Sequence, residues 1–160
     1  MKVELRPLVS ADAEVAVHWR NDPAVWTFTT AAGRGVVDVE TERAWIERVT
    51  VDPTNCRRAI IADGTYVGNV YLTDIADGTA QFHIFIGDRD AWGRGIGRRA
   101  TVAILDLGWR ELGLGSVWLL VHRDNAAALA LYRRLGFEFA AREGEFDRMV
   151  VSRADRGDLG

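Results

Sequence analysis

The sequence predicts an α+β domain built on a mixed, mostly antiparallel sheet, and three observations support this fold class. Helix-like and strand-like segments alternate along the chain with no linker, repeat or low-complexity tract. Asp-Gly dipeptides at 63–64 and 77–78 separate three successive strand-like segments, as tight hairpins do. A Glu-Gly dipeptide at 143–144 marks a closing hairpin. At 160 residues, the chain is expected to form a single domain over 1–160.

The N-terminal part is predicted to contribute one strand and two helices. Residues 2–8 alternate in polarity and indicate the strand. Ser10 is expected to cap a helix that continues to about Arg20, where an Asn-Asp-Pro tripeptide ends it. After an irregular stretch at 24–38, a second helix is expected over 40–49. Its periodicity predicts a buried face made of Ala44, Trp45 and Val49.

The remaining elements form an antiparallel meander, two helices and three more strands. A glycine-rich run at 92–99 opens a helix with apolar residues at i, i+4 and i+7 spacing, which stops near Gly113. Asp124-Asn125 caps the next helix, and Gly136 closes it. The strands predicted for the whole chain, seven in number, cover residues 2–8, 58–62, 66–73, 80–86, 116–121, 137–141 and 146–151.

Composition restricts the class of protein. The net charge of −3 argues against broad binding of nucleic acid, and no apolar run has the ~18 residues that a membrane span needs. The first residues lack an apolar signal-peptide core, so a cytoplasmic protein is expected. A single cysteine, Cys56, excludes an intramolecular disulfide and suits a reducing compartment.

The glycine-rich run has the chemistry of an anion site. Gly93, Gly95 and Gly97 allow a tight turn with uncovered amides, and the helix that begins there adds its positive dipole end. Three arginines crowd the same helix start, where cations are disfavoured, so a phosphate is expected. A P-loop would need a lysine, and a dinucleotide fingerprint would need Gly-x-Gly-x-x-Gly in a βαβ unit. The remaining alternative is a solvated loop.

The position of this run points to a family. A Gly-x-Gly turn between a meander's last strand and a helix resembles the pyrophosphate loop of the GNAT acetyltransferase superfamily. Many members carry Gln or Arg three residues before the Gly-x-Gly, whereas Trp92 stands there in this chain. Trp-Gly-x-Gly resembles a subgroup that includes N-terminal acetyltransferases of ribosomal proteins and amino-sugar acetyltransferases. The segment 18–23, with its Trp-Arg-Asn sequence, resembles the same subgroup.

A second motif, about thirty residues further on, supports this resemblance. The stretch 122–137 is similar to the superfamily's Asn-x-x-Ala helix that ends in Tyr-x-x-x-Gly-Phe. Its Asn125 and Tyr132 are seven residues apart and therefore project from nearly the same side of the helix, where one ligand could meet both. Asn125 either caps the helix or contacts the coenzyme's pantetheine arm, and both readings stay open. Without the family, Tyr132 would be read as a packing residue.

The resemblance implies a sheet with helices on both faces and an acetyl-coenzyme A-dependent N-acetyltransferase that needs no metal. The acceptor would be a primary amine of a small molecule such as an amino sugar, attacking the thioester directly in a ternary complex. Alternatives are an enzyme that acetylates protein or peptide N-terminal amines, and a non-catalytic coenzyme A-binding module. The resemblance assigns coenzyme contacts to Phe85, Ile86, Trp92, Gly93, Arg94, Gly95, Ile96, Gly97, Arg98, Asn125 and Tyr132.

The chemistry of acyl transfer assigns roles to some of these residues. In the family, the tyrosine at the Tyr132 position returns a proton to the departing thiolate, which suits a phenol with a pKa near ~10 and a thiol near ~8.5. The oxyanion is expected to meet a backbone amide near Phe85 or Ile86. A base would help to deprotonate the amine, and His83 is the candidate, with Asp74 and His122 as alternatives.

The acceptor is expected to lie against the N-terminal part of the chain. Trp19 and Trp45 are interpreted as core residues of two amphipathic helices. Trp26 and Phe28 fall in the irregular segment and are the candidate residues of the acceptor pocket. Exposed edge strands in such folds favour pairing into a homodimer.

Overall fold

The computed structural model describes residues 1–26 and 36–153, and its centre is a seven-stranded sheet in the order β1-β2-β3-β4-β5-β7-β6. Every neighbouring pair is antiparallel except β4 and β5, which are parallel. This confirms the predicted mixed sheet and its strands. The strands are β1 (Val3–Pro7), β2 (Cys56–Ala62), β3 (Thr65–Ala76), β4 (Thr79–Ile86), β5 (Ser116–His122), β6 (Glu138–Glu143) and β7 (Phe146–Ser152).

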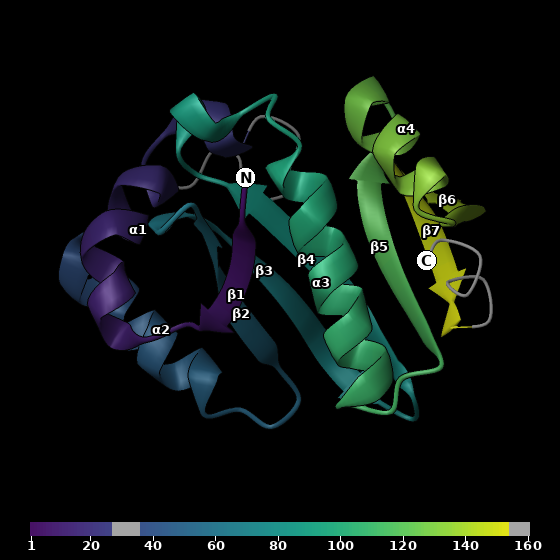
Figure 1. The fold of residues 1–160 in the computed structure, drawn as a ribbon, viewed down its shortest axis with the longest axis horizontal. Coiled ribbons are helices and arrows are strands. Elements are labelled where there is room, and N and C mark those ends of the chain that lie inside the picture. Colours follow the sequence, from purple (N-terminus) through teal and green to yellow (C-terminus); the bar gives the residue numbers. More distant parts are fainter. Residues whose placement is uncertain (27–35, 154–160) are drawn as a thin grey trace.

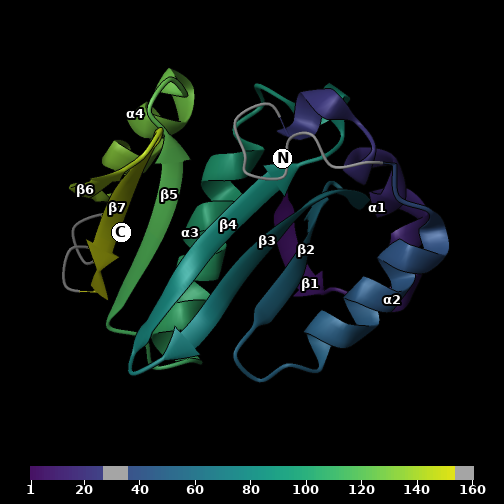
Figure 2. The ribbon, with the colours of Figure 1, turned by 180° about the vertical axis from the view of Figure 1, so that it is seen from behind.

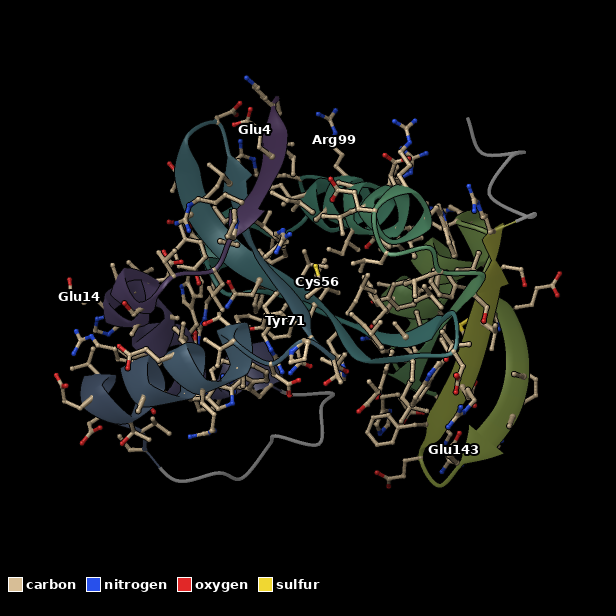
Figure 3. All side chains as sticks on the ribbon, turned by 90° about the horizontal axis from the view of Figure 1, so that it is seen from below. Glu4, Glu14, Cys56, Tyr71, Arg99 and Glu143 are labelled. Atoms are coloured by element: carbon tan, nitrogen blue, oxygen red, sulfur yellow. The ribbon has the colours of Figure 1, made fainter. Side chains whose placement is uncertain are left out.

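Helices cover both faces of the sheet, as the resemblance implied. α3 and α4 lie on one face and α1 and α2 on the other (Figures 1 and 3). No helix of the described residues is both long and apolar enough to span a bilayer. The α-helices are α1 (Ala13–Arg20), α2 (Val39–Thr50), α3 (Ile96–Arg110) and α4 (Ala126–Arg134), and short 3₁₀ helices occupy Ser10–Asp12, Pro23–Trp26 and Arg89–Ala91.

Two Asp-Gly turns set the register of the β2-β3-β4 meander. Asp63 and Gly64 have φ of 48° and 84°, and Asp77 and Gly78 have φ of 53° and 76°. Positive φ at both central residues is the signature of the type I′ turn, whose twist matches that of the flanking strands. The local sequence therefore determines both hairpins, as predicted.

Strand alternation divides the side chains of the meander between two cores. Val70, Leu72 and Phe82 face α3 in the larger core. Ala59 and Tyr71 point to the opposite face and pack in a smaller core with Ile46 of α2. Figure 3 shows Tyr71 on the α1 and α2 side of the sheet, whereas Arg99 lies on α3 at the other side.

Two local predictions for the N-terminal part are wrong. Ser10 makes no helix-capping hydrogen bond. Instead the Asp12 carboxylate accepts from the Val9 amide at 2.9 Å and from the Arg6 guanidinium at 2.7 and 2.8 Å. The buried face of α2 also differs from the predicted one. Ala44, which was predicted to be buried, is exposed, and the buried residues are Glu42 and Ile46. A buried ion pair between Glu42 and Arg20 allows the charged residue to face inward.

Candidate active site

The candidate site begins where β4 and β5 separate. These parallel strands pair only through Thr79–Gln81 and Ser116–Trp118, and they diverge beyond that point (Figure 2). The open end of the gap is the end at which α3 begins and beside which α4 lies (Figure 1). Within residues 1–26 and 36–153, the second half of β4 therefore has no strand partner on its β5 side.

The register of β3 and β4 decides which amides face this open edge. The Gly87 amide donates to the Val67 carbonyl oxygen at 2.8 Å. Because antiparallel pairs alternate between bonded and non-bonded positions, the amide of Phe85 is directed to β3, opposite Asn69. The amides of Ile84 and Ile86 point the other way. Of the two residues expected to supply an oxyanion donor, the register favours Ile86.

The glycine-rich loop opens α3 with its amides uncovered. Gly93 and Gly95 adopt positive φ of 74° and 78°, and Gly95 is the N-cap residue, in a left-handed conformation. The first helical bond runs from the Arg99 amide to the Gly95 carbonyl oxygen, so the preceding helical amides lack intrahelical acceptors. No side chain in the described part of the structure caps this end, whereas Asp38 caps α2 and Asn125 caps α4. The geometry suits a bound anion.

Trp92 attaches this loop to the end of β4. Its indole N–H donates to the Ile86 carbonyl oxygen at 2.7 Å, and 45% of the residue is exposed. Arg94 and Arg98 are exposed at the helix start, while the Arg99 guanidinium donates to the Met1 carbonyl oxygen. The loop and the open strand edge therefore form one continuous surface.

Tyr132 approaches the gap from α4. The residue is 8% exposed and packs edge-on against Phe82 and Phe137, with ring centroids 5.8 and 5.6 Å away. Burial raises the pKa of its phenol, which keeps the hydroxyl protonated. Within the described residues that hydroxyl has no hydrogen-bond partner. Asn125, two turns earlier, caps α4 by accepting from the Ala128 amide at 3.3 Å.

A cavity of about 580 Å³ brings several predicted residues together. Tyr132, His83, Phe85, Trp26 and Asp74 all line it, although they come from four separate elements. The glycine-rich loop and Asn125 do not line it, so the predicted coenzyme contacts are divided: Phe85 and Tyr132 face the cavity, whereas the loop lies outside it. The other lining residues are Arg20, Trp45, Asn55, Arg57, Tyr71, Thr73, Gln81, Phe82, Ile84, Leu119, Leu120 and Phe146.

His83 lies on the face of β4 that is covered by α1 and α2. It pairs with Tyr71 of β3, and its Nε2 is 3.0 Å from the Thr73 hydroxyl oxygen. Although its side chain is open to the cavity, the surrounding protein and the Arg57 charge lower its pKa to about 4. His83 is thus neutral at physiological pH. Of the alternatives, Asp74 lines the cavity, whereas His122 does not, and its Nδ1 accepts from the Asp124 amide.

Aromatic rings form the wall of the cavity. The Trp26 indole N–H donates to the Trp19 carbonyl oxygen at 2.9 Å, and its ring lies 4.9 Å from that of Phe85. Trp19 is buried, which confirms its interpretation as a core residue. Trp45 differs, because it is only partly buried and faces the cavity. Phe28 lies outside the described residues.

Arg57 is the main site residue that sequence reasoning missed. It lies on β2, and its guanidinium carbon is 4.3 Å from the centre of the Tyr71 ring and 4.9 Å from that of Trp45. Burial lowers its pKa. The available signal was the pair Arg57 and Arg58 near the start of a strand whose other residues are apolar, because burying a charge in such a strand is costly.

Known proteins resemble this chain in both sequence and fold. A mycothiol acetyltransferase of Clavibacter sepedonicus is 36% identical over 115 residues, which are 72% of this chain and 36% of that relative. A spermidine N(1)-acetyltransferase of Escherichia coli K12 is 33% identical over 96 residues, or 59% of this chain and 50% of the relative. The chain thus spans about a third of the length of the mycothiol acetyltransferase it matches.

A solved structure shares the fold across nearly the full chain. The crystal structure of spermidine N-acetyltransferase from Vibrio cholerae, in complex with CoA and spermine, superposes with a TM-score of 0.86 at 20% identity. The superposition covers 96% of this chain and 97% of that one. The sequence model of the acetyltransferase (GNAT) domain matches residues 2–138, so this chain belongs to the GNAT acetyltransferase family.

Proposed function

We propose that this chain transfers an acetyl group from acetyl-coenzyme A to the primary amine of a small molecule. Family membership supports this, as do the relatives named mycothiol and spermidine acetyltransferase. The observation that carries the proposal is the open edge of β4, which runs between the uncovered loop amides at 93–98 and the Tyr132 hydroxyl. A thioester lying along that edge would have an anion site at one end and a proton donor at the other.

The main-chain amides would supply binding and charge stabilisation. The loop at 93–98 and the α3 N-terminus would hold the pyrophosphate. The Ile86 amide would donate to the oxyanion that forms when the amine attacks the thioester carbon. Trp92 would fix the position of the loop relative to the Ile86 amide, because its indole N–H donates to the Ile86 carbonyl oxygen.

Side chains on either side of the gap would donate a proton to the thiolate and accept a hydrogen bond from the amine. As the C–N bond forms and the C–S bond breaks, Tyr132 would give its proton to the departing thiolate, and a proton lost by the amine would replace it. His83 would accept a hydrogen bond from the amine or from an intervening water. Its pKa of about 4 makes it a weak base that would rarely remove a proton from an ammonium group. The amine would therefore bind mainly in its unprotonated form.

The proposal is tested by measuring thiol release and thermal stabilisation on the same purified protein. Acetyl-coenzyme A should raise the melting temperature, and one member of a panel of small amines should release free thiol. A coenzyme-dependent shift without thiol release from either an amine panel or a peptide panel would favour the non-catalytic alternative. Release by peptides alone would favour the N-terminal acetyltransferase. Absence of any thermal shift would contradict the proposed site.

We also propose that the chain forms a homodimer through β6. This strand ends the sheet, all six of its residues are exposed, and Phe139 on it is 57% exposed. An open strand edge with an exposed aromatic residue favours pairing with a second copy. Light scattering should give the mass of a dimer, and Phe139→Lys should reduce it to that of a monomer. A monomeric parent protein at tens of micromolar would contradict this.

A further inference from the structure

We propose that the acceptor amine carries an oxyanion, a carboxylate or a phosphate, which Arg57 binds at the wall of the cavity. This inference rests on the proposed acetyl transfer and specifies the substrate class of the same site. The inference excludes polyamines as the preferred acceptors of this chain, because they would bring further positive charge into the cavity.

The first observation is the placement of the Arg57 guanidinium. Arg57 pairs with Tyr71 across β2 and β3, and its guanidinium lies over the rings of both Tyr71 and Trp45 while its side chain lines the cavity. A guanidinium has five N–H donors, so the side-chain hydrogen bond to Tyr71 leaves others available. These remaining donors can bind a carboxylate or a phosphate through charge-assisted hydrogen bonds.

The second observation is that Arg57 has no direct ion-pair partner in the described part of the chain, although the charge of Asp52 acts on it from a distance. Over the described ranges, Arg57 forms no ion pair with a carboxylate, and its buried Nε has no hydrogen-bond partner. The neighbouring Arg20 differs, since its Nε lies 3.2 Å from Glu42 Oε2. An unpaired cation in a partly buried site is costly, and a bound anion would remove that cost.

Asp74 does not neutralise the charge of Arg57. Among the described residues that line the cavity it is the one carboxylate, and it is exposed towards the end of β3. Its charge acts on His83, whereas the charges that act on Arg57 include those of Arg20 and Asp52 but not Asp74. Asp74 therefore does not offset the charge of Arg57.

A second donor faces the same region. The Tyr66 hydroxyl donates to Asn69 Oδ1 at 2.7 Å, and Asn69 Nδ2 donates to the Tyr71 hydroxyl oxygen at 3.0 Å. Because Tyr71 accepts in this chain of bonds, its own proton is available to another acceptor. Burial raises the Tyr71 pKa to about 12, so the hydroxyl stays protonated. Arg57 and Tyr71 together offer donors to the cavity, which suits an anion.

Matched pairs of amines test the inference. Phenylalanine is compared with phenylalaninamide for a carboxylate, glucosamine 6-phosphate with glucosamine for a phosphate, and spermidine serves as the polycation. Initial rates of thiol release with acetyl-coenzyme A give kcat/KM for each. In at least one pair, we expect the member that carries the carboxylate or phosphate to exceed the partner that lacks it about 10-fold or more, and the pair that responds identifies the anionic group.

Variants then connect that preference to Arg57. Arg57→Gln should raise the KM of the preferred anionic amine about 10-fold and leave the neutral partner within about 3-fold. Arg48→Gln is the matched control, because Arg48 is an exposed residue of α2 that lines a different cavity and its loss changes the net charge equally. Thermal stabilisation by acetyl-coenzyme A, measured on both variants, verifies that the fold and the coenzyme site remain intact.

The possible failures are distinguishable. If neutral amines or spermidine react as fast as the anionic ones, the inference is overturned while the proposed function stands. An anion preference that persists in Arg57→Gln would overturn the assignment to Arg57. If coenzyme binds but no amine on the panel releases thiol, the proposed function fails, and with it the inference that rests on it.

Discussion

Gly87 lies so close to the Trp19 indole that a Cβ built on it would be 2.0 Å from the ring. The contact joins α1 to the residue that directly follows β4. Since Trp19 also accepts the hydrogen bond of the Trp26 indole through its carbonyl oxygen, it links this junction to the wall of the cavity. Glycine is required here because the Trp19 ring approaches the backbone closely, and not because the backbone has an unusual angle.

Gly87→Ala should therefore destabilise the fold. The added methyl must displace the Trp19 ring, and overpacking of this kind costs about 1–3 kcal/mol in the free energy of unfolding. Urea unfolding followed by tryptophan fluorescence measures the loss. Gly115→Ala is the control, because the Cβ there would meet only an ordinary contact at 3.8 Å. Equal stability of the two variants would show that the ring has room to move.

Gly97→Ala should separate coenzyme binding from stability. A Cβ at Gly97 meets nothing within 4 Å, and alanine favours a helix over glycine by about 1 kcal/mol, so the melting temperature should stay equal or rise. The methyl would nevertheless stand at the helix start where a phosphate is expected to approach. Isothermal titration should give about 10-fold weaker binding of coenzyme A. Unchanged affinity would remove Gly97 from the proposed coenzyme contacts.

Tyr132→Phe should lower turnover with little other effect. The variant keeps the packing against Phe82 and Phe137, and the hydroxyl that it removes has no partner within the described part of the chain. We expect kcat to fall about 10²-fold or more, as for loss of a general acid, at nearly constant coenzyme affinity and melting temperature. Steady-state kinetics and titration measure both quantities. A variant with the parent kcat would contradict the acid role.

His83 should remain neutral down to unusually low pH. Because its pKa is lowered to about 4, the imidazole should not titrate near 6.5 in the folded protein. NMR titration of the ring protons, assigned by their loss in His83→Gln, provides the measurement. The unfolded chain binds the proton near pH 6.5, so this residue should contribute to loss of stability as the pH falls from 6.5 towards 4. A midpoint near 6.5 in the folded protein would contradict this environment.

The tyrosines should make the protein sensitive to alkali. Tyr66, Tyr71 and Tyr132 are the three tyrosines of the chain, and burial raises the pKa of each. In the unfolded chain the phenols release protons near pH ~10, whereas the native state retains them. The native state then binds more protons, so its stability falls as the pH rises above 10. Phenolate absorbance should appear together with loss of circular dichroism, and ionisation before unfolding would contradict the burial.

Local chemistry made much of this architecture predictable from the sequence. The two type I′ hairpins depend on Asp-Gly pairs that adopt positive φ, and the start of α4 depends on the Asn125 side chain that caps it. The glycine-rich loop is equally local, since Gly93 and Gly95 adopt backbone angles that other residues resist. Each of these features involves residues a few positions apart. The sequence by itself therefore determined the order of the elements and the family motifs.

Contacts between distant segments decided the rest. The buried side of α2 depends on an ion pair between Arg20 and Glu42, and the amide that faces the open edge depends on the register of β4 against β3. Arg57 is identified as a residue of the candidate site only in the folded structure, where β2, β3 and α2 place Tyr71 and Trp45 beside it. Such positions follow from packing and strand register, which local sequence patterns do not contain. Tertiary structure alone thus decided which charges face the cavity.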